Sequence, residues 1–135
     1  MQFAYTILYV QDVRATVDFY ESAFGLRRRF VHEAGDFAEM ETGATALAFS
    51  SFALMQTLGK NPRRAEAGAP SFEIALTTSD VPASVAHAVA AGARLVKAPE
   101  HMPWGQTVAY VADLNDVLVE LCTPVTPSTP GTPQP

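Results

Sequence analysis

The chain has 135 residues, 48% of them hydrophobic and 17% charged, which is enough for one ordinary globular domain with its own core. A formal net charge of -5 and a pI near 5.0 argue against a nucleic-acid partner, because the basic runs are confined to residues 27–29 and 63–64. The single cysteine, Cys122, excludes an intramolecular disulfide, and no apolar run approaches the roughly 18 residues of a membrane helix.

The N-terminal segment predicts a strand followed by a helix. MQFAYTILYVQD lacks the basic start and the cleavage site of a signal peptide, so we expect a cytoplasmic protein. Asp12 is a predicted N-cap and Gly25 a predicted helix stop. Between them, apolar residues recur at the spacing of an amphipathic helix: Val13, Val17, Tyr20 and Phe24.

Three strand-like segments follow this helix, at about 27–33, 36–41 and 44–51. Residues 52–70 then form a connecting segment of glycine, proline and charged residues, with a short helical turn expected at its start. We expect this connector to be the most mobile part of the chain before its tail.

The second half of the sequence repeats the first. Residues 71–81 match residues 3–13 at a constant offset of 68, which pairs Tyr5 with Glu73. A second helix is predicted from Asp80 to Gly92, followed by strands at about 94–98, 106–112 and 117–123. The last strands of the halves align at an offset of 72, which pairs Ala48 with Glu120.

These elements predict an α+β fold made of two βαβββ modules. The modules span residues 3–51 and 71–123 and are expected to form one domain over residues 1–123. The tail, residues 124–135, is rich in proline and threonine and is predicted to be disordered.

Period-two alternation assigns the faces of the predicted strands. In residues 117–123, Glu120 shares one face with Leu118 and Cys122. In residues 71–78, Glu73 lies with small residues, opposite a face of large apolar side chains. Because helices cover large apolar faces, we expect the carboxylate-bearing face to become a cupped surface with room for a ligand where the sheets curl.

The residues that carry these modules resemble a known family. ILYVQDVRATVDFYESAFGL in the first half and WGQTVAYVADLNDVLVEL in the second are similar to the vicinal oxygen chelate superfamily, which contains glyoxalase I, bleomycin-resistance proteins and extradiol dioxygenases. The resemblance covers roughly residues 3–123. It implies a cupped mixed sheet, a homodimer and, in metal-dependent members, a divalent ion held in the cup.

The resemblance also implies where such an ion would be held. The four ligand positions of the family fall on Tyr5, Ala48, Glu73 and Glu120, of which only Glu120 matches the usual residue. Both usual histidines are replaced and Ala48 has no donor atom, so no cofactor is expected. If a metal (Mn, Mg, Zn, Ni or Fe) is bound, Glu73, Glu120 and Tyr5 are its expected ligands.

Further side chains are predicted to line the ligand-binding cup. Tyr9 shares the alternate face of the first strand with Tyr5, and its alternative role is core filling. Trp104 precedes the penultimate strand and would stack on a flat ligand or pack at an edge. His101 is predicted in the same loop, either donating to a ligand or merely exposed.

Three functions are compatible with these residues. The first is a protein of the bleomycin-resistance type that binds a small organic molecule in a cup without a metal. The second is an enzyme, a lyase, isomerase or dioxygenase, that uses a metal or uses Glu73 and Glu120 as acid and base. The third is a non-catalytic interaction module, which predicts a cup filled by its own side chains. No nucleic-acid or membrane partner is expected in any of them.

Overall fold

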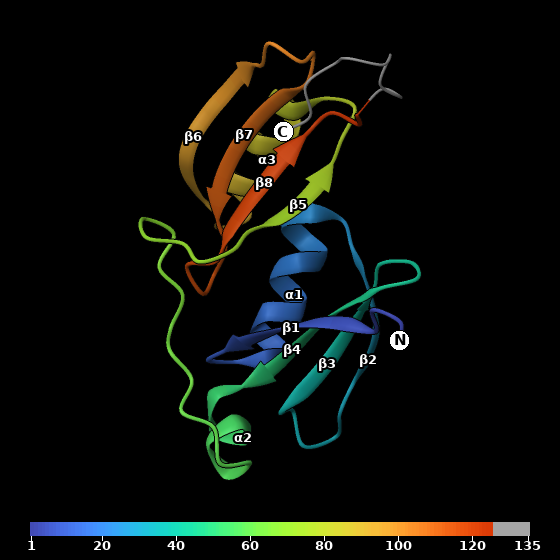
Figure 1. The fold of residues 1–135 in the computed structure, drawn as a ribbon, viewed down its shortest axis with the longest axis vertical. Helices are drawn as coiled ribbons and strands as arrows, with labels where there is room; N and C mark the ends of the chain where they lie inside the picture. The colour runs from blue at the N-terminus through green and yellow to red at the C-terminus, as the bar shows by residue number, and fades with distance from the viewer. Residues whose placement is uncertain (126–135) are drawn as a thin grey trace. The chain divides into compact units, whose positions relative to one another are not determined.

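The protein is described by a computed structural model in which residues 1–125 are placed (Figure 1). The chain divides into two compact units, Met1–Ala65 and Glu66–Pro135, and the division falls within the predicted connector, residues 52–70. Whether they act as one domain stays a prediction. The predicted disorder of residues 124–135 lies, from residue 126 onward, outside the described residues.

The first unit is a four-stranded mixed sheet in the order β1-β4-β3-β2, with β1 parallel to β4 and the other pairs antiparallel. Its elements, in chain order, are β1 (Tyr5–Val10), α1 (Val13–Phe24), β2 (Arg27–Val31), β3 (Phe37–Glu41), β4 (Ala46–Ser51) and α2 (Phe52–Thr57).

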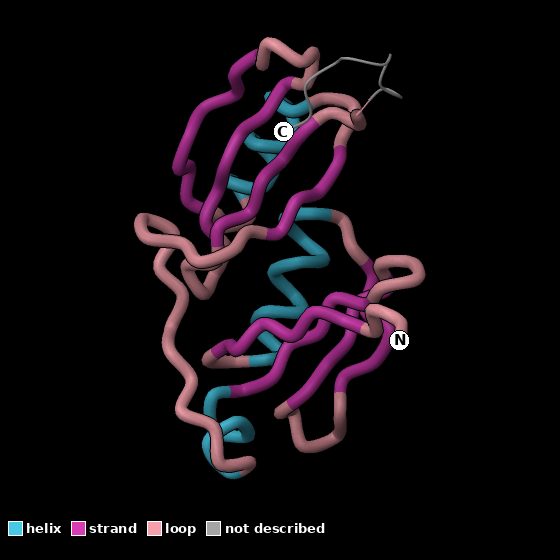
Figure 2. The backbone as a smooth tube through the Cα atoms, viewed as in Figure 1, coloured by secondary structure: helices cyan, strands magenta, loops and turns pink. Residues whose placement is uncertain are grey.

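The second unit repeats this plan in the order β5-β8-β7-β6, again with the first and last strands parallel. Its elements are β5 (Ile74–Thr77), α3 (Val81–Ala90), β6 (Arg94–His101), β7 (Thr107–Ala112) and β8 (Leu118–Cys122). Each unit is therefore βαβββ, as predicted, and the connector between α2 and β5 is loop throughout (Figure 2).

The strand registers agree with both sequence offsets. Ile7 pairs with Ala48 across β1 and β4, and Ala75 pairs with Glu120 across β5 and β8. Adding 68 to the first position and 72 to the second converts one pair into the other. Ala48 and Glu120 are therefore equivalent positions of the two sheets.

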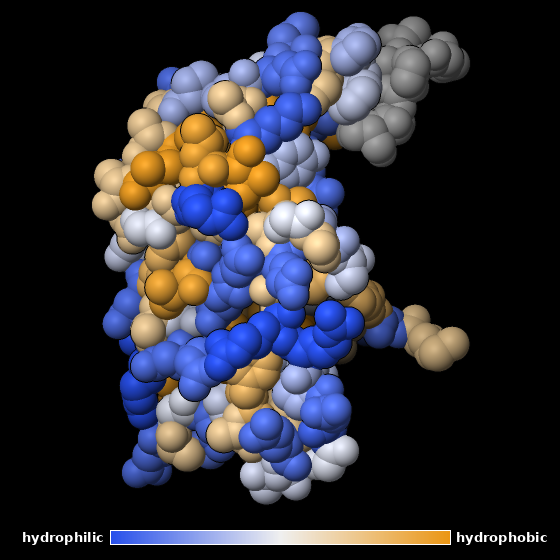
Figure 3. Space-filling model, turned by 90° about the vertical axis from the view of Figure 1, so that its left-hand side faces the viewer, coloured by the Kyte–Doolittle hydropathy of each residue, from blue (hydrophilic) through white to orange (hydrophobic). Residues whose placement is uncertain are grey.

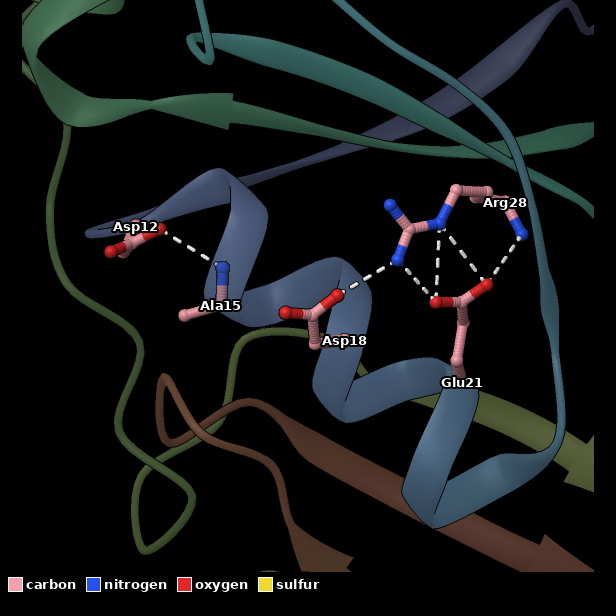
Figure 4. Close-up of polar contacts among 5 residues, drawn as sticks. All are labelled: Asp12, Ala15, Asp18, Glu21 and Arg28. Atoms are coloured by element: carbon pink, nitrogen blue, oxygen red, sulfur yellow. Dashed lines mark hydrogen bonds and ion pairs between the residues drawn. The ribbon is translucent and has the colours of Figure 1, made fainter.

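Helix α1 begins where the sequence predicts, because Asp12 caps it. The Asp12 carboxylate accepts a hydrogen bond from the Ala15 backbone N–H at 3.0 Å (Figure 4). Farther along, Arg28 of β2 forms ion pairs with Asp18 and Glu21 on the exposed side of the helix. The hydrogen bond from Arg28 holds the pKa of Glu21 below its usual value.

One face of each sheet is buried by its helix. In the first unit, Leu8 of β1 pairs with Phe49 of β4, and the Phe49 ring meets the Tyr20 ring of α1 at 4.9 Å between centroids. In the second unit, α3 packs against β6, β7 and β8, where Val111 and Val119 are fully buried. Helix α3 is the only helix among the described residues of the second unit, so the opposite face of that sheet has no helix from residues 66–125.

The boundaries of several elements depart from the predicted ones. Strand β5 begins at Ile74 rather than at residue 71, so Glu73 lies just before the strand. Strand β6 continues to His101, which corrects the prediction that this histidine lies in a loop. Helix α3 ends at Ala90 with Ala91 as its C-cap, one residue before the predicted stop Gly92, which follows at φ 115°.

Strand β6 forms the outer edge of the second sheet, and all eight of its residues are exposed. Leu95 and Val96 are 47% and 40% exposed, and hydrophobic residues gather on the surface of this part of the unit (orange, upper half of Figure 3). Two register shifts interrupt its pairing with β7, which is a common feature of edge strands. Within residues 1–125, no helix has the length and apolar composition needed to span a bilayer.

Candidate functional site

The candidate site is the face of the second sheet that α3 does not cover, called here the open face. Its central row is formed by Ala75, Glu120 and Tyr110, which lie opposite one another on β5, β8 and β7. The next row contains Thr77, Cys122 and Val108. Alternation places all six side chains on one side of the sheet.

Two carboxyl groups meet on this face. Glu120 is half-buried on β8, and the exposed Glu73 precedes β5, which is hydrogen-bonded to β8. Burial, the negative charge of Glu73 and a hydrogen bond to Glu73 all raise the pKa of Glu120. A carboxyl pair in hydrogen-bonding contact favours one shared proton, because two adjacent negative charges repel.

Neighbouring titratable groups respond to the same environment. Burial, followed by the charges of Glu120 and Glu73, raises the pKa of Tyr110 and also that of Cys122. The Cys122 thiol donates a long hydrogen bond, 3.8 Å, to the Leu76 carbonyl. Both groups therefore remain protonated near neutral pH, so Tyr110 is a hydrogen-bond donor and Cys122 is not an activated nucleophile.

The loop between β6 and β7 brings a tryptophan to one end of the open face. The indole N–H of Trp104 donates to the side-chain oxygen of Gln106 at 2.8 Å, and the Gln106 amide nitrogen donates to the Thr123 carbonyl at 2.8 Å. Gln106 is only 5% exposed, whereas Trp104 is half-buried. The indole is thus held by its polar edge and keeps part of its ring surface accessible.

The equivalent face of the first sheet differs from the open face in the pairing of its carboxylates and in its burial. Ala48, the counterpart of Glu120, is fully buried. The carboxylates of this face, Glu39 and Glu41, are both paired with Arg29, at 3.3 Å and 2.9 Å. The hydrogen bond from Arg29 lowers the pKa of Glu41, in contrast to the raised pKa of Glu120.

Aromatic side chains occupy the rest of that face. Tyr5 is 47% exposed at the start of β1. Tyr9 is half-buried near its end, where Lys60 lies 5.6 Å from the centre of its ring and donates to its hydroxyl at 3.4 Å. This tyrosine is thus held by the connector, in contrast to Tyr5.

The residues at the family metal positions do not fit a metal site. Tyr5 and Ala48 offer a phenol and a methyl group in the first unit, and Glu73 and Glu120 offer two carboxyls in the second. Across residues 1–125, no three His, Cys, Asp or Glu side chains are grouped so as to hold an ion. A hydrogen-bonded carboxyl pair that favours a proton is also a weak substitute for the imidazole and carboxylate ligands of transition metals.

The structure brings some of the predicted residues together. Glu73 and Glu120 meet, and Trp104 lies in the loop that leads into the same sheet. His101 ends β6 opposite Thr107, and its side chain is exposed. Tyr5, Tyr9 and Ala48 belong to the first unit.

Two residues of the open face were missed by the sequence analysis, Tyr110 and Gln106. Tyr110 could have been found by extending the alternation of β8 across its antiparallel neighbour, where it faces Glu120. Gln106 gives no such signal, because a buried glutamine in a loop is not distinguishable from an exposed one by its spacing.

Comparison with known proteins agrees with this fold. The family model described as the Glyoxalase/Bleomycin resistance protein/Dioxygenase superfamily matches residues 2–121. No curated protein is a significant match. A solved glyoxalase-related enzyme from Fulvimarina pelagi is 21% identical and superposes with a TM-score of 0.80, covering 98% of this chain and 95% of its own.

Two further solved structures are similar. A glyoxalase/bleomycin resistance protein/dioxygenase family enzyme from Burkholderia phytofirmans PsJN is 20% identical, with a TM-score of 0.76 over 93% of this chain and 100% of its own. TioX from Micromonospora sp. ML1 is 24% identical, with a TM-score of 0.68 over 91% and 98%. The chain belongs to the glyoxalase/bleomycin resistance protein/dioxygenase superfamily, which confirms the predicted family and fold.

Proposed function

We propose that this protein binds a small organic molecule on the open face of the second sheet, without a metal ion. The observation that carries the proposal is the contact between Glu120 and Glu73 on the sheet face opposite α3, which no helix of residues 66–125 covers. One face thus combines a polar anchor, a hydroxyl donor at Tyr110 and an aromatic ring at Trp104. Such a mixture of an apolar wall and a few placed polar groups is typical of small-molecule sites.

The chemistry of the face favours an amphipathic or cationic ligand. Burial and like charge disfavour a second negative charge in the carboxyl pair, so a bound cation would relieve the repulsion. Lys97, which lies opposite Tyr110 in the next strand, is directed to Glu100 at 3.0 Å and is therefore neutralised by that residue. The function is then sequestration of the bleomycin-resistance type.

Binding is tested with single variants of the anchor and the ring. Glu120→Gln is expected to weaken the affinity of a bound organic cation by about tenfold or more, since hydrogen bonds to charged groups contribute about 1.5–3 kcal/mol. Trp104→Ala is expected to weaken it as well, because it removes the ring that attracts a cation through its face. Glu66→Gln is the matched control, because Glu66 is an exposed carboxylate of the same unit and its replacement leaves the Lys97–Glu100 ion pair intact. Candidate ligands come from a thermal-shift screen of organic cations and neutral analogues of the same size.

The outcome that contradicts the site is equally specific. A ligand whose affinity is unchanged by both Glu120→Gln and Trp104→Ala binds elsewhere. Stoichiometric metal in untagged, purified protein, together with stabilisation by Mn²⁺, Ni²⁺, Zn²⁺ or Mg²⁺, would favour the metal-dependent reading over this one. Participation of Tyr5 and Tyr9, a homodimer and a cytoplasmic location remain predictions that accompany the proposal.

The carboxyl pair supports a second candidate function, proton transfer on the bound molecule. A carboxyl group with a raised pKa beside a second carboxyl group is an arrangement that can supply a general acid and its base. In that case Glu120→Gln abolishes turnover while the Michaelis complex still forms. If Glu120→Gln instead loses binding and the wild-type protein leaves its ligand unchanged, sequestration is the function.

A further inference from the structure

Gln106 is the one buried polar side chain of the open face whose two hydrogen bonds join the Trp104 loop to the sheet. Its side-chain oxygen accepts from the Trp104 indole at 2.8 Å, and its amide nitrogen donates to the Thr123 carbonyl at 2.8 Å. With 5% of its surface exposed, it is largely sealed from water. Neither bond is needed to join this end of β7 to Thr123, since the Thr123 N–H donates to the Thr107 carbonyl at 3.1 Å and the Thr107 N–H donates to the Thr123 hydroxyl at 3.0 Å.

The two bonds leave Gln106 with one orientation. Its amide nitrogen is committed to the Thr123 carbonyl, which can only accept, so the oxygen must face the indole, which can only donate. A reversed amide would place donor against donor and acceptor against acceptor. The orientation of Trp104 is therefore set by the end of β8 through Gln106.

The position of Gln106 connects it with the candidate site. It directly precedes β7, and alternation places it on the same side of the sheet as Val108 and Tyr110 of β7. These two residues lie opposite Cys122 and Glu120 of β8. The order along the open face is thus Gln106 with Trp104 at one end, then Cys122, then the carboxyl pair.

We propose that Gln106 is a positioning residue that holds the Trp104 ring in its ligand-binding orientation before the ligand arrives. The inference rests on the proposed binding function, but its central statement concerns the ligand-free protein. Loop side chains that must be ordered on binding reduce affinity, and a ring already held avoids that loss. Gln106 acts through Trp104 and need not touch the ligand.

Trp104 is the only tryptophan of the chain, so its fluorescence reports on this ring alone. Gln106→Met keeps the side-chain length but removes both hydrogen bonds. Time-resolved anisotropy and acrylamide quenching of the ligand-free protein are expected to show a new nanosecond motion and a quenching constant raised about twofold or more in Gln106→Met.

Thr123→Val is the matched control for local loosening. It removes the hydroxyl that accepts from the Thr107 N–H at 3.0 Å but keeps the main-chain carbonyl that accepts from Gln106. Its Trp104 anisotropy is expected to equal that of the wild type. The proposal would be overturned if the wild type and Gln106→Met, both shown to be folded by circular dichroism, had equal anisotropy and equal quenching. It would also be overturned if Thr123→Val increased the mobility of the Trp104 ring as much as Gln106→Met does.

The second arm measures affinity with proflavine, a planar aromatic cation, followed by the anisotropy of the dye. Gln106→Met is expected to weaken its binding about three- to tenfold, as the loss of a hydrogen bond of ordinary strength would. Trp104→Phe keeps a ring but lacks the N–H, so adding Gln106→Met to it should change the affinity no further. A full additional loss in the double variant means that Gln106 acts directly rather than through Trp104.

The two arms separate the inference from the proposed function. If proflavine and the other screened cations do not bind the wild type, the proposed function fails, while the ligand-free fluorescence still decides the role of Gln106. If binding is strong but insensitive to Gln106→Met, the positioning role is refuted and the binding site stands. Far-UV circular dichroism of each variant, with Gln106→Leu as a second apolar replacement, excludes misfolding as the cause.

Discussion

Ala48 of the first sheet and Glu120 of the second sheet occupy equivalent positions. Exchanging the two residue types tests whether the two sheet faces differ in their tolerance of a carboxylate. Ala48→Glu puts into the first sheet the residue that the second sheet carries at Glu120. Ala48 is fully buried and lies between Ile7 and Glu39 in the register. The new carboxylate would face a like charge in a closed space, whereas Glu120 lies half-buried between Ala75 and Tyr110.

The expected loss follows from two contributions. Overpacking a fully buried position costs about 1–3 kcal/mol, and burying a charge without a partner costs several kcal/mol more. Arg29 is already shared between Glu39 and Glu41 and compensates only part of this. Ala48→Glu is therefore expected to lower the free energy of unfolding at pH 7 by about 3–6 kcal/mol, a large fraction of the about 5–15 kcal/mol of a typical domain.

Urea unfolding followed by circular dichroism measures this loss, with Glu120→Ala as the reciprocal control. Glu120→Ala is expected to change stability by less than about 1 kcal/mol, because lost packing is offset by removal of the repulsion from Glu73. The deficit of Ala48→Glu should shrink toward pH 5, where a buried carboxyl takes up a proton. A loss below about 1 kcal/mol at pH 7 would show that the first face accepts a carboxylate as readily as the second, and would refute the asymmetry.

Three further predictions concern single groups. The pKa of Glu120 is raised above 4.5 in the folded state, so the folded protein binds more protons than the unfolded chain and its stability should fall as the pH rises from about 4.5 through the raised pKa. Urea titrations of Glu120→Gln should lack this fall, and identical stability profiles of the variant and the wild type would contradict the prediction. Cys122 is 5% exposed and its thiol pKa is raised, so in the folded protein it should react with a thiol reagent at least about tenfold more slowly than glutathione does at pH 8. Unfolding in urea should remove this difference, whereas a fast reaction of the folded protein would show that the thiol is accessible to solvent. Asp12→Ala and Asp80→Ala each remove an N-cap hydrogen bond of 3.0 Å and should each lower the unfolding free energy by about 1 kcal/mol, whereas a much larger loss in one of them would break the equivalence of the two helices.

The local elements could be predicted because their signals are local. Asp12 and Asp80 cap the helices where their spacing indicates, since a cap is a contact between residues three positions apart. The repeat offsets gave the equivalence of Ala48 and Glu120 before any register was known, because strands of duplicated modules keep their pairing. The boundaries of β5 and β6 were less accurate, since a strand ends where its partner ends rather than at a residue of its own.

The sequence by itself determined the two βαβββ modules, the family and the side of β8 on which Glu120 lies, because alternation and helical spacing are properties of consecutive residues. Only the tertiary structure decided which residues lie next to Glu120. The structure showed that Glu73 hydrogen-bonds to Glu120, that Tyr110 lies opposite Glu120, and that Ala48 is fully buried. It also showed that a buried Gln106 holds the Trp104 indole. Burial and contact between residues distant in sequence set these charges and orientations, and neither is encoded in the spacing of a single segment.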